Sequence, residues 1–206
     1  MPRREQQRAG FSLVELLIVI SLIGILAATI LPSANPSIHD QLHAGAQLLS
    51  ADIGYARNLA VANGSSYKLT FDLALNQYTL LHSGTNTALA KLPRSPFDAP
   101  DDPLDRQITR FASLPHTGAV VQLHAVQSLG SPPVGVNDLE FNPLGETARA
   151  AETQIWLAAG AGAAKRYLLI RVSPVTGLCW TENYRADEPI VAADAVATTT
   201  PVGTGL

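Results

Sequence analysis

The N-terminal part of the chain constrains its fold more than any other segment. Residues 11–31 form an apolar run that contains one charged residue, Glu15. As a helix rising about 1.5 Å per residue, this run is roughly 32 Å long and matches a hydrocarbon core about 30 Å thick. A carboxylate inside a bilayer is unfavourable unless something neutralises it. The run is therefore predicted to span a membrane once, and Glu15 is expected to have a partner.

The charges before the apolar run predict its orientation. Three arginines precede it and only one acid does, namely Arg3, Arg4, Arg8 and Glu5. Because positively charged flanks stay on the cytoplasmic side, the N-terminus is expected in the cytoplasm and the chain after Pro32 outside it.

Three interpretations of this segment are open. A secretory signal peptide would be cleaved near Pro32-Ser33-Ala34, although the apolar run is longer than the usual span of about 7 to 15 residues. A plain single-span anchor explains the length and the flanking charges but not Glu15. The third interpretation follows from a sequence motif and accounts for the carboxylate as well.

The motif is Gly10-Phe11-Ser12-Leu13-Val14-Glu15-Leu16-Leu17-Ile18-Val19-Ile20. It closely resembles the class III signal of type IV pilins and type II secretion pseudopilins. The resemblance implies that a prepilin peptidase cleaves after Gly10 and that the new N-terminal residue, Phe11, is N-methylated. It also implies that Glu15 pairs with the Phe11 amine of a neighbouring, staggered subunit, since two charges that are costly alone are tolerated as a pair.

Helical periodicity continues beyond Pro32 to about residue 62, with Pro32 and Pro36 expected to kink or interrupt the path. The apolar positions recur three, four and seven apart, at Ile38, Leu42, Leu49, Ile53, Ala56 and Ala60, and the polar positions are Asp40, Gln41, Gln47, Asp52, Arg57 and Asn58. This pattern predicts an amphipathic helix that covers a domain. Asn63-Gly64 is expected to end it.

After Gly64 the hydrophobic period changes to two, which predicts a β-hairpin from residues 67–72 and 78–81. Further strands are predicted at residues 107–114, 119–126, 138–142, 153–159, 166–173 and 178–184. The expected fold class is therefore α+β, with one long, kinked N-terminal helix, whose first half spans the membrane, packed on antiparallel β-sheet.

Parts of this pattern are similar to GspH/FimT-type minor pseudopilins. Residues 48–61, leading into 67–72, resemble the helix end and first strand of that family, and residues 139–145 and 172–178 resemble its two C-terminal turn-and-strand elements. Arg57 then has two open interpretations, a structural residue at the helix end or a solvated arginine. Two glycines within the later elements are predicted turn positions that need unusual backbone angles, Gly145 and Gly177.

The expected organisation is a cleaved leader (1–10), a transmembrane and assembly helix (11–32), a periplasmic pilin-like α+β domain (33–190) and a disordered tail (191–206). Residues 83–105 are expected to form an irregular, exposed insertion.

Other chemistry is not favoured. The net charge is −3 and no Lys/Arg cluster lies beyond the leader, so nucleic-acid binding is not indicated. Cys179 is the sole cysteine, which excludes an intrachain disulfide, and it is interpreted as a small buried side chain. His39-Asp40-Gln41-Leu42-His43 imitates the HExxH zinc motif, but no third ligand is evident, so solvated histidines are favoured.

Two loops are weak ligand candidates. Carboxylates spaced like Asp98, Asp101, Asp102 and Asp105 can hold calcium, yet they lack the spacing of a defined calcium motif, so a solvated loop is favoured. Residues 160–165 resemble a phosphate loop only superficially and are predicted to connect two strands. No cofactor or metal is expected.

The predicted function is that of a non-enzymatic minor pseudopilin of a type II secretion system-like filament. Its expected partners are prepilin peptidase, other pseudopilins through the N-terminal helix, an inner-membrane assembly platform and the lipid bilayer. The alternatives are a minor pilin of a type IV pilus or DNA-uptake filament and, from a different class, a membrane-anchored binding or hydrolytic domain. The sequence leaves the type of system, the position in the filament and the cargo open.

Overall fold

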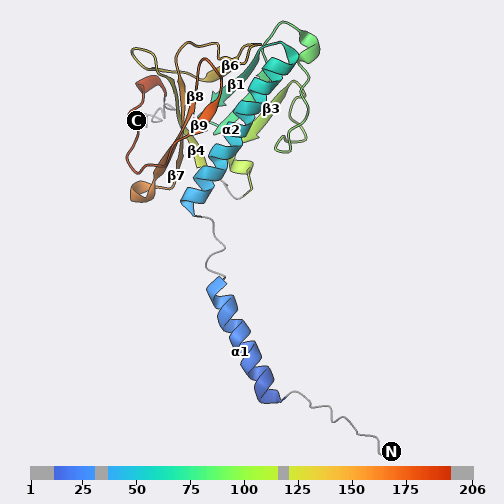
Figure 1. The fold of residues 1–206 in the computed structure, drawn as a ribbon, viewed down its shortest axis with the longest axis vertical. Helices are drawn as coiled ribbons and strands as arrows, with labels where there is room; N and C mark the ends of the chain where they lie inside the picture. The colour runs from blue at the N-terminus through green and yellow to red at the C-terminus, as the bar shows by residue number, and fades with distance from the viewer. Residues whose placement is uncertain (1–11, 31–36, 116–120, 196–206) are drawn as a thin grey trace, which may run out of the picture. The chain divides into compact units, whose positions relative to one another are not determined.

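The computed structural model describes residues 12–30, 37–115 and 121–195 (Figure 1). The chain divides into two units, Met1–Pro36 and Ser37–Leu206. The first unit contains α1 (Leu13–Ile30), and its described side chains are exposed. In the described part of the chain, no helix combines the length and the apolar character needed to cross a membrane.

The second unit begins with α2 (Ile38–Asn63), whose ends follow from its sequence. The Ser37 hydroxyl accepts a hydrogen bond from the Asp40 N–H, and the Asp40 carboxylate accepts one from the Ser37 N–H, which closes a capping box. Gly64 follows the last turn in the left-handed conformation, with φ of 57°. The predicted helix end is confirmed, whereas the break predicted near Pro32 and Pro36 lies outside the described residues.

Nine strands occur in the described residues, arranged as two antiparallel sheets. The first sheet has the order β3-β2-β1-β6, formed by β3 (Arg106–Arg110), β2 (Gln77–His82), β1 (Tyr67–Asp72) and β6 (Asp138–Phe141). The second has the order β5-β4-β7-β8-β9, formed by β5 (Val134–Gly135), β4 (Val121–Ser128), β7 (Thr153–Ala159), β8 (Arg166–Val172) and β9 (Cys179–Thr181). The predicted α+β class and the β1–β2 hairpin are confirmed.

Several strand boundaries differ from the predictions, and among them the strand expected to end at residue 126 runs to Ser128. The strand expected at residues 107–114 ends at Arg110, because the chain turns into a 3₁₀ segment at Phe111–Ser113. The strand expected at 178–184 is shortened to Cys179–Thr181. The two-residue strand β5 was not anticipated, since two residues give no periodic signal.

Helix α2 packs against strands of both sheets (Figure 1). The predicted apolar face of the helix is fully buried, and Leu42, Leu49 and Ile53 expose none of their surface. Strand β7 is buried on both faces: Ile155 and Leu157 join this core, whereas Trp156 belongs to a second apolar cluster on the opposite face of the sheet.

The second cluster is covered by the start of the predicted tail. Ala195 is buried, the Ala192 N–H donates to Gln127 Oε1 at 2.9 Å, and Asp194 Oδ1 accepts from the Gly135 N–H at 2.8 Å. The prediction of disorder from residue 191 is therefore wrong for residues 191–195. These residues are held by apolar contact and single side-chain bonds, which leave no periodic pattern, and residues 196–206 lie outside the described part.

Asn76 connects the two sheets from the turn between β1 and β2. It is a non-glycine residue with positive φ, 50°. Its Nδ2 donates to the carbonyl oxygen of Val121 and its Oδ1 accepts from the Leu123 N–H, both at 2.8 Å. The carboxamide thus makes the pair of bonds that a neighbouring strand would make to the edge of β4.

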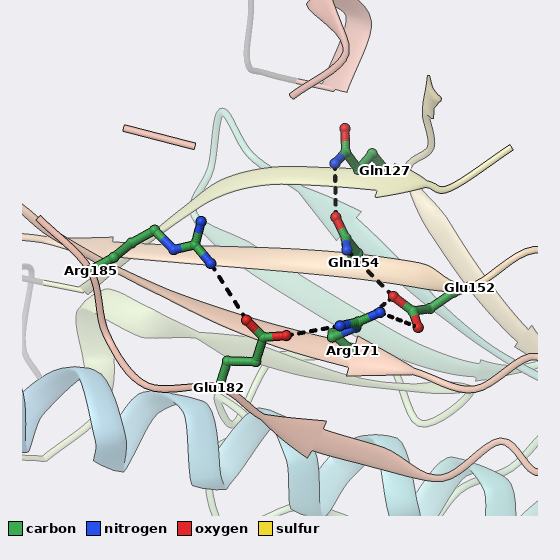
Figure 2. A network of polar contacts seen from close by, with 6 residues as sticks. All are labelled: Gln127, Glu152, Gln154, Arg171, Glu182 and Arg185. Carbon is green, nitrogen blue, oxygen red and sulfur yellow. Dashed lines mark hydrogen bonds and ion pairs between the residues drawn. The ribbon is translucent and has the colours of Figure 1, made fainter. Parts of the chain in front are cut away.

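A polar network crosses the second sheet on the face that carries the second cluster (Figure 2). Arg171 donates to both carboxylate oxygens of Glu152, at 2.7 and 2.9 Å, and to Glu182 at 2.9 Å, and the two carboxylates raise the pKa of the guanidinium. Gln127 and Gln154 join β4 to β7 at 2.9 Å. Because such partly exposed pairs contribute at most about 1 kcal/mol each, the network aligns neighbouring strands more than it stabilises them.

Asp52 lies on α2 but faces the first sheet, although the helical pattern assigned it to the polar positions. Its Oδ2 accepts a hydrogen bond from the Tyr78 hydroxyl at 2.7 Å, and the Thr109 hydroxyl lies 3.5 Å away. Burial raises the pKa of the Asp52 carboxyl, because desolvation disfavours its charged form. Burial, and then the Asp52 charge, raise the pKa of Tyr78 well above its ordinary value.

We expect Asp52→Asn to leave the unfolding free energy at neutral pH unchanged or increased. Asparagine keeps an acceptor for the Tyr78 hydroxyl and removes a buried charge. Because the folded-state pKa of Asp52 is raised, its stabilising contribution is present in full below 3.8 and is lost as the pH rises through the raised value. The variant lacks this part of the pH dependence, which urea unfolding of the full chain in detergent between about pH 4 and pH 8 measures.

The matched control is Asp52→Ala, which leaves the buried Tyr78 hydroxyl without its carboxylate acceptor. We expect it to lower the unfolding free energy by about 1–3 kcal/mol. Equal losses for the asparagine and alanine variants would contradict this account of the pair.

Candidate functional site

Of the N-terminal motif, the structure describes Glu15 and its surroundings. Glu15 lies exposed in the first turn of α1 and is the one charged residue of that helix. A carboxylate is favourable there, because the N-terminal end of a helix carries partial positive charge. Gly10 and Phe11 lie outside the described residues. The pairing of Glu15 with an amine requires a second subunit and stays a prediction.

Apart from Glu15 and Ser21, the described side chains of α1 are apolar. Large aliphatic side chains from Leu13 to Leu26 are exposed on every side of the helix. The hydroxyl of Ser21 donates to the carbonyl oxygen of Leu17 at 2.7 Å, so it is satisfied within the helix. A helix of this kind is stable when lipid or other apolar segments surround it.

A second candidate site lies near the C-terminal end of α2, where Arg57 meets two turns that are distant in sequence. Arg57 Nε donates to the carbonyl oxygen of Thr176 at 2.6 Å. Its side chain lies against Gly145 and Gly177, where an added Cβ would come within 3.2 Å of Nε and 3.1 Å of Cδ respectively. Both glycines have positive φ, 84° and 64°, as predicted. Of the two interpretations of Arg57, the structure supports the structural one.

The two turns are also bonded to each other. In the first, the Gly145 N–H donates to the carbonyl oxygen of Asn142 at 2.8 Å, and in the second, the Gly177 N–H donates to that of Ser173 at 2.9 Å. Between them, the Thr147 N–H donates to the carbonyl oxygen of Pro174 at 2.9 Å. We call Arg57 together with residues 142–147 and 173–178 the turn cluster.

The turn cluster bears exposed apolar side chains that sequence reasoning did not single out. Leu144 is 82% exposed, Val175 77% and Leu178 56%. Val61, from the last turns of α2, is 49% exposed and lies beside Gly145. Their signal in the sequence is an aliphatic residue inside a tight turn, where polar residues are the usual choice.

The two histidines of the HExxH-like stretch pack against an aromatic ring. The His39 ring lies 4.0 Å from the Tyr184 ring between centroids, and His43 approaches the same ring edge-on at 6.3 Å. The prediction of solvated histidines is therefore wrong, because the chain after β9 brings Tyr184 beside the start of α2. Within the described ranges, no group of three or more His, Cys, Asp or Glu residues is placed to hold a metal ion.

The acidic loop is held by its own chain. Asp98 accepts hydrogen bonds from the backbone N–H groups of Ser95 and Ile108 at 2.7 and 2.9 Å. Asp102 forms a two-pronged pair with Arg110 at 2.7 and 2.8 Å, which is the main cause that lowers the pKa of Asp102 to about 2. Three of the four acids, Asp105 included, have partners in the chain, while residues 103–106 and Asp101 are exposed, as expected for a surface loop.

Two further predictions concern single features. Cys179 is half-buried, its Sγ lies 3.5 Å from the carbonyl oxygen of Ser50, and burial raises the pKa of the thiol, as for an inert packed cysteine. Residues 160–165 connect β7 to β8 through a 3₁₀ turn at Gly162–Ala164, so the predicted strand connection is confirmed.

Comparison with known proteins gives a family match for the N-terminal segment. The family model described as the prokaryotic N-terminal methylation motif matches residues 6–31, which include Gly10, Phe11 and Glu15. No curated protein matches the chain.

Three solved structures are similar to this chain. The type IV minor pilin FimU of Pseudomonas aeruginosa strain PAO1 is 13% identical with a TM-score of 0.42, over 71% of this chain and 90% of that one. A second crystal form of FimU is 17% identical with a TM-score of 0.41, over 68% and 92%. The minor pseudopilin EpsH from the type 2 secretion system of Vibrio cholerae is 13% identical with a TM-score of 0.48, over 70% and 98%.

We expect Gly177→Ala to destabilise the chain more than Gly162→Ala. Both glycines have positive φ, 64° and 54°, so each substitution carries a backbone penalty of about 1–2 kcal/mol. At Gly162 no atom lies within 4 Å of an added Cβ, whereas at Gly177 the Cβ would collide with the carbonyl oxygen of Gly145. In urea unfolding, the free energy of unfolding should fall by about 1–3 kcal/mol more for Gly177→Ala than for Gly162→Ala. Equal losses would show that the two turns are not closely packed.

Proposed function

We propose that this chain is a minor pseudopilin, a non-enzymatic subunit of a type II secretion-like filament assembled from the inner membrane. The observation that carries the proposal is the match of residues 6–31 to the N-terminal methylation motif. Within that match, glycine, aromatic residue and glutamate stand in the order of a prepilin signal, at Gly10, Phe11 and Glu15.

In this proposal, prepilin peptidase removes the leader after Gly10, and Phe11 becomes the N-methylated first residue. Cleavage creates a cationic amine four residues before Glu15. We propose that this amine pairs with Glu15 of an axially staggered neighbouring subunit. The pair neutralises two charges that are each costly in apolar surroundings, and it fixes the axial stagger between subunits.

The proposal places residues 11–31 in the bilayer before assembly, with the N-terminus cytoplasmic and the α+β domain periplasmic. The apolar surface of α1 and the arginines before it support this placement. After assembly, the helices of neighbouring subunits replace lipid around α1. The span stays a prediction, because it counts residue 11 and residue 31, which lie outside the described residues.

A minor pilin of a type IV pilus or DNA-uptake filament is the alternative that uses the same motif. The net charge of −3 and the lack of a basic cluster beyond the leader favour a subunit that does not itself bind DNA. A plain anchored domain would keep its original N-terminus and would leave Glu15 without a partner, which this interpretation does not explain.

We expect mass spectrometry of the chain from membranes of its host to give N-methylated Phe11 as the first residue. Methylation follows cleavage in this mechanism, so an unmodified start at Phe11 should be a minor species. A start at Met1 would contradict the proposal in favour of a plain anchor, and a start near Asn35 in favour of a signal peptide.

We expect Glu15→Ala to leave membrane insertion intact and to lower incorporation into filaments about tenfold or more. The variant leaves a neighbour's amine unpaired among apolar helices, which costs about 2.5–3.5 kcal/mol for a charge deep in a bilayer and somewhat less near its edge. Immunoblots of sheared filaments and of the membrane fraction measure the ratio of assembled to membrane-inserted subunit.

Two matched variants separate charge from side-chain size. Glu15→Gln keeps the shape and loses the charge, so it should fail like the alanine variant. Ser12→Ala changes an exposed polar residue of the same segment and should assemble normally. Unchanged incorporation of both Glu15 variants would contradict the proposal that Glu15 sets the axial stagger between subunits.

A further inference from the structure

The guanidinium of Arg57 is anchored at one end and open at the other. Its Nε is bonded to the carbonyl oxygen of Thr176 at 2.6 Å. Its two terminal nitrogens have no partner among the described residues, and neither belongs to the buried polar atoms, so both reach the surface. A guanidinium in this state presents free N–H donors in a fixed direction.

The surrounding turns hold the Arg57 side chain in place. Gly145 and Gly177 lie against it, and the two turns are themselves joined by the hydrogen bond from Thr147 to Pro174 at 2.9 Å. A side chain held in this way loses little rotamer freedom when it binds, which removes one of the main costs of association. Arginine in such a setting is suited to a two-pronged bond with a carboxylate.

Exposed apolar side chains stand next in sequence to Gly145 and Thr176, the residues that Arg57 contacts. Leu144 and Val175 are more than three-quarters exposed, and both stand on hydrogen-bonded turns rather than in open loops. Val61 adds a third aliphatic side chain from α2. An arginine on a surface that also exposes aliphatic residues has the composition of an interface centre, in which apolar contacts exclude water from the charged contact.

Two acids within or just before the turn cluster in the sequence have other partners. Glu146 accepts from Asn142 Nδ2 at 3.4 Å, and Glu140 accepts from the Ser83 hydroxyl at 2.6 Å. Arg57 is also the single basic residue of the turn cluster. A nucleic acid or a lipid surface would need several basic residues, whereas one cation on a surface that exposes aliphatic residues is complementary to one carboxylate in an aliphatic setting.

We propose that the turn cluster is a docking surface for another protein, which contributes one Asp or Glu side chain, flanked by aliphatic residues, to the terminal nitrogens of Arg57. The inference concerns the Ser37–Leu206 unit alone. It goes beyond the proposed function and holds equally for a filament subunit and for an anchored domain.

The test converts the proposed contact into a covalent bond. Arg57→Lys puts an amine at this position, and a water-soluble carbodiimide joins that amine, with loss of one water, to a carboxylate that touches it. The full-length variant is treated in membranes of its host and digested for mass spectrometry. We expect an amide between position 57 and an Asp or Glu of a different polypeptide, reduced at least fivefold by adding Leu144→Ser and Val175→Ser.

Matched variants control for position and for surface apolarity. Arg166→Lys changes another half-buried arginine that is bonded to main-chain carbonyls, and it should give no such link. Leu75→Ser and Ile190→Ser remove exposed aliphatic side chains elsewhere and should leave the link at position 57 unchanged. Val175→Lys, at an exposed position where folding is not at stake, is a second donor and should link to the same polypeptide.

The outcomes separate this inference from the proposed function. Links only to this chain's own acids, such as Glu146, or no link from either donor, would overturn the docking surface, as would a link that survives loss of both Leu144 and Val175. The N-terminus is measured in the same sample. A link with a start at Met1 leaves the docking surface standing and rejects the filament, whereas N-methylated Phe11 without a link does the reverse.

Discussion

Both sheets pack against the apolar face of α2, and the rest of the structure depends on this contact. Among the described residues no strand pairs across the two sheets, and helix α2 packs against strands of both. Leu42, Leu49 and Ile53 are fully buried in this shared layer. A sheet with one apolar face needs a second layer to cover it, and here one helix serves two sheets. The positions of both sheets therefore depend on the burial of one helical stripe.

Three polar side chains then fix the relative orientation of elements that apolar packing alone does not determine. Asp52 ties α2 to β2 through Tyr78, Asn76 ties the first sheet to the edge of β4, and Arg57 ties the end of α2 to the turn between β8 and β9. Each bond joins elements that are far apart in sequence. Apolar contact is non-directional, whereas a hydrogen bond has a preferred geometry, so these links set orientation within a core whose stability comes from burial.

Local periodicity explains how much of this arrangement could be predicted. The stripe from Leu42 to Ala60 and the β1–β2 hairpin follow from spacings of 3.6 and 2, which are written into neighbouring residues. The role of Arg57 could not be decided from the sequence, because its partner Thr176 lies 119 positions away. Asp52 was misassigned for the same reason, since the helical pattern marks a polar position without showing which sheet it faces. Residues 191–195 are held by isolated contacts with no period at all.

The two candidate surfaces each combine aliphatic side chains with a single charged residue, and the two charges have opposite sign. On α1 a single carboxylate, Glu15, stands in an aliphatic helix, and in the turn cluster a single cation, Arg57, stands among aliphatic side chains. Aliphatic surface alone supplies affinity but accepts many alignments, because contact area changes little when one surface slides along another. A lone charge that must find its counter-ion penalises every other alignment, so it adds specificity at little gain in affinity. Under the proposed function, Glu15 would set the axial stagger of neighbouring helices, and Arg57 would set the orientation of a partner on the α+β domain.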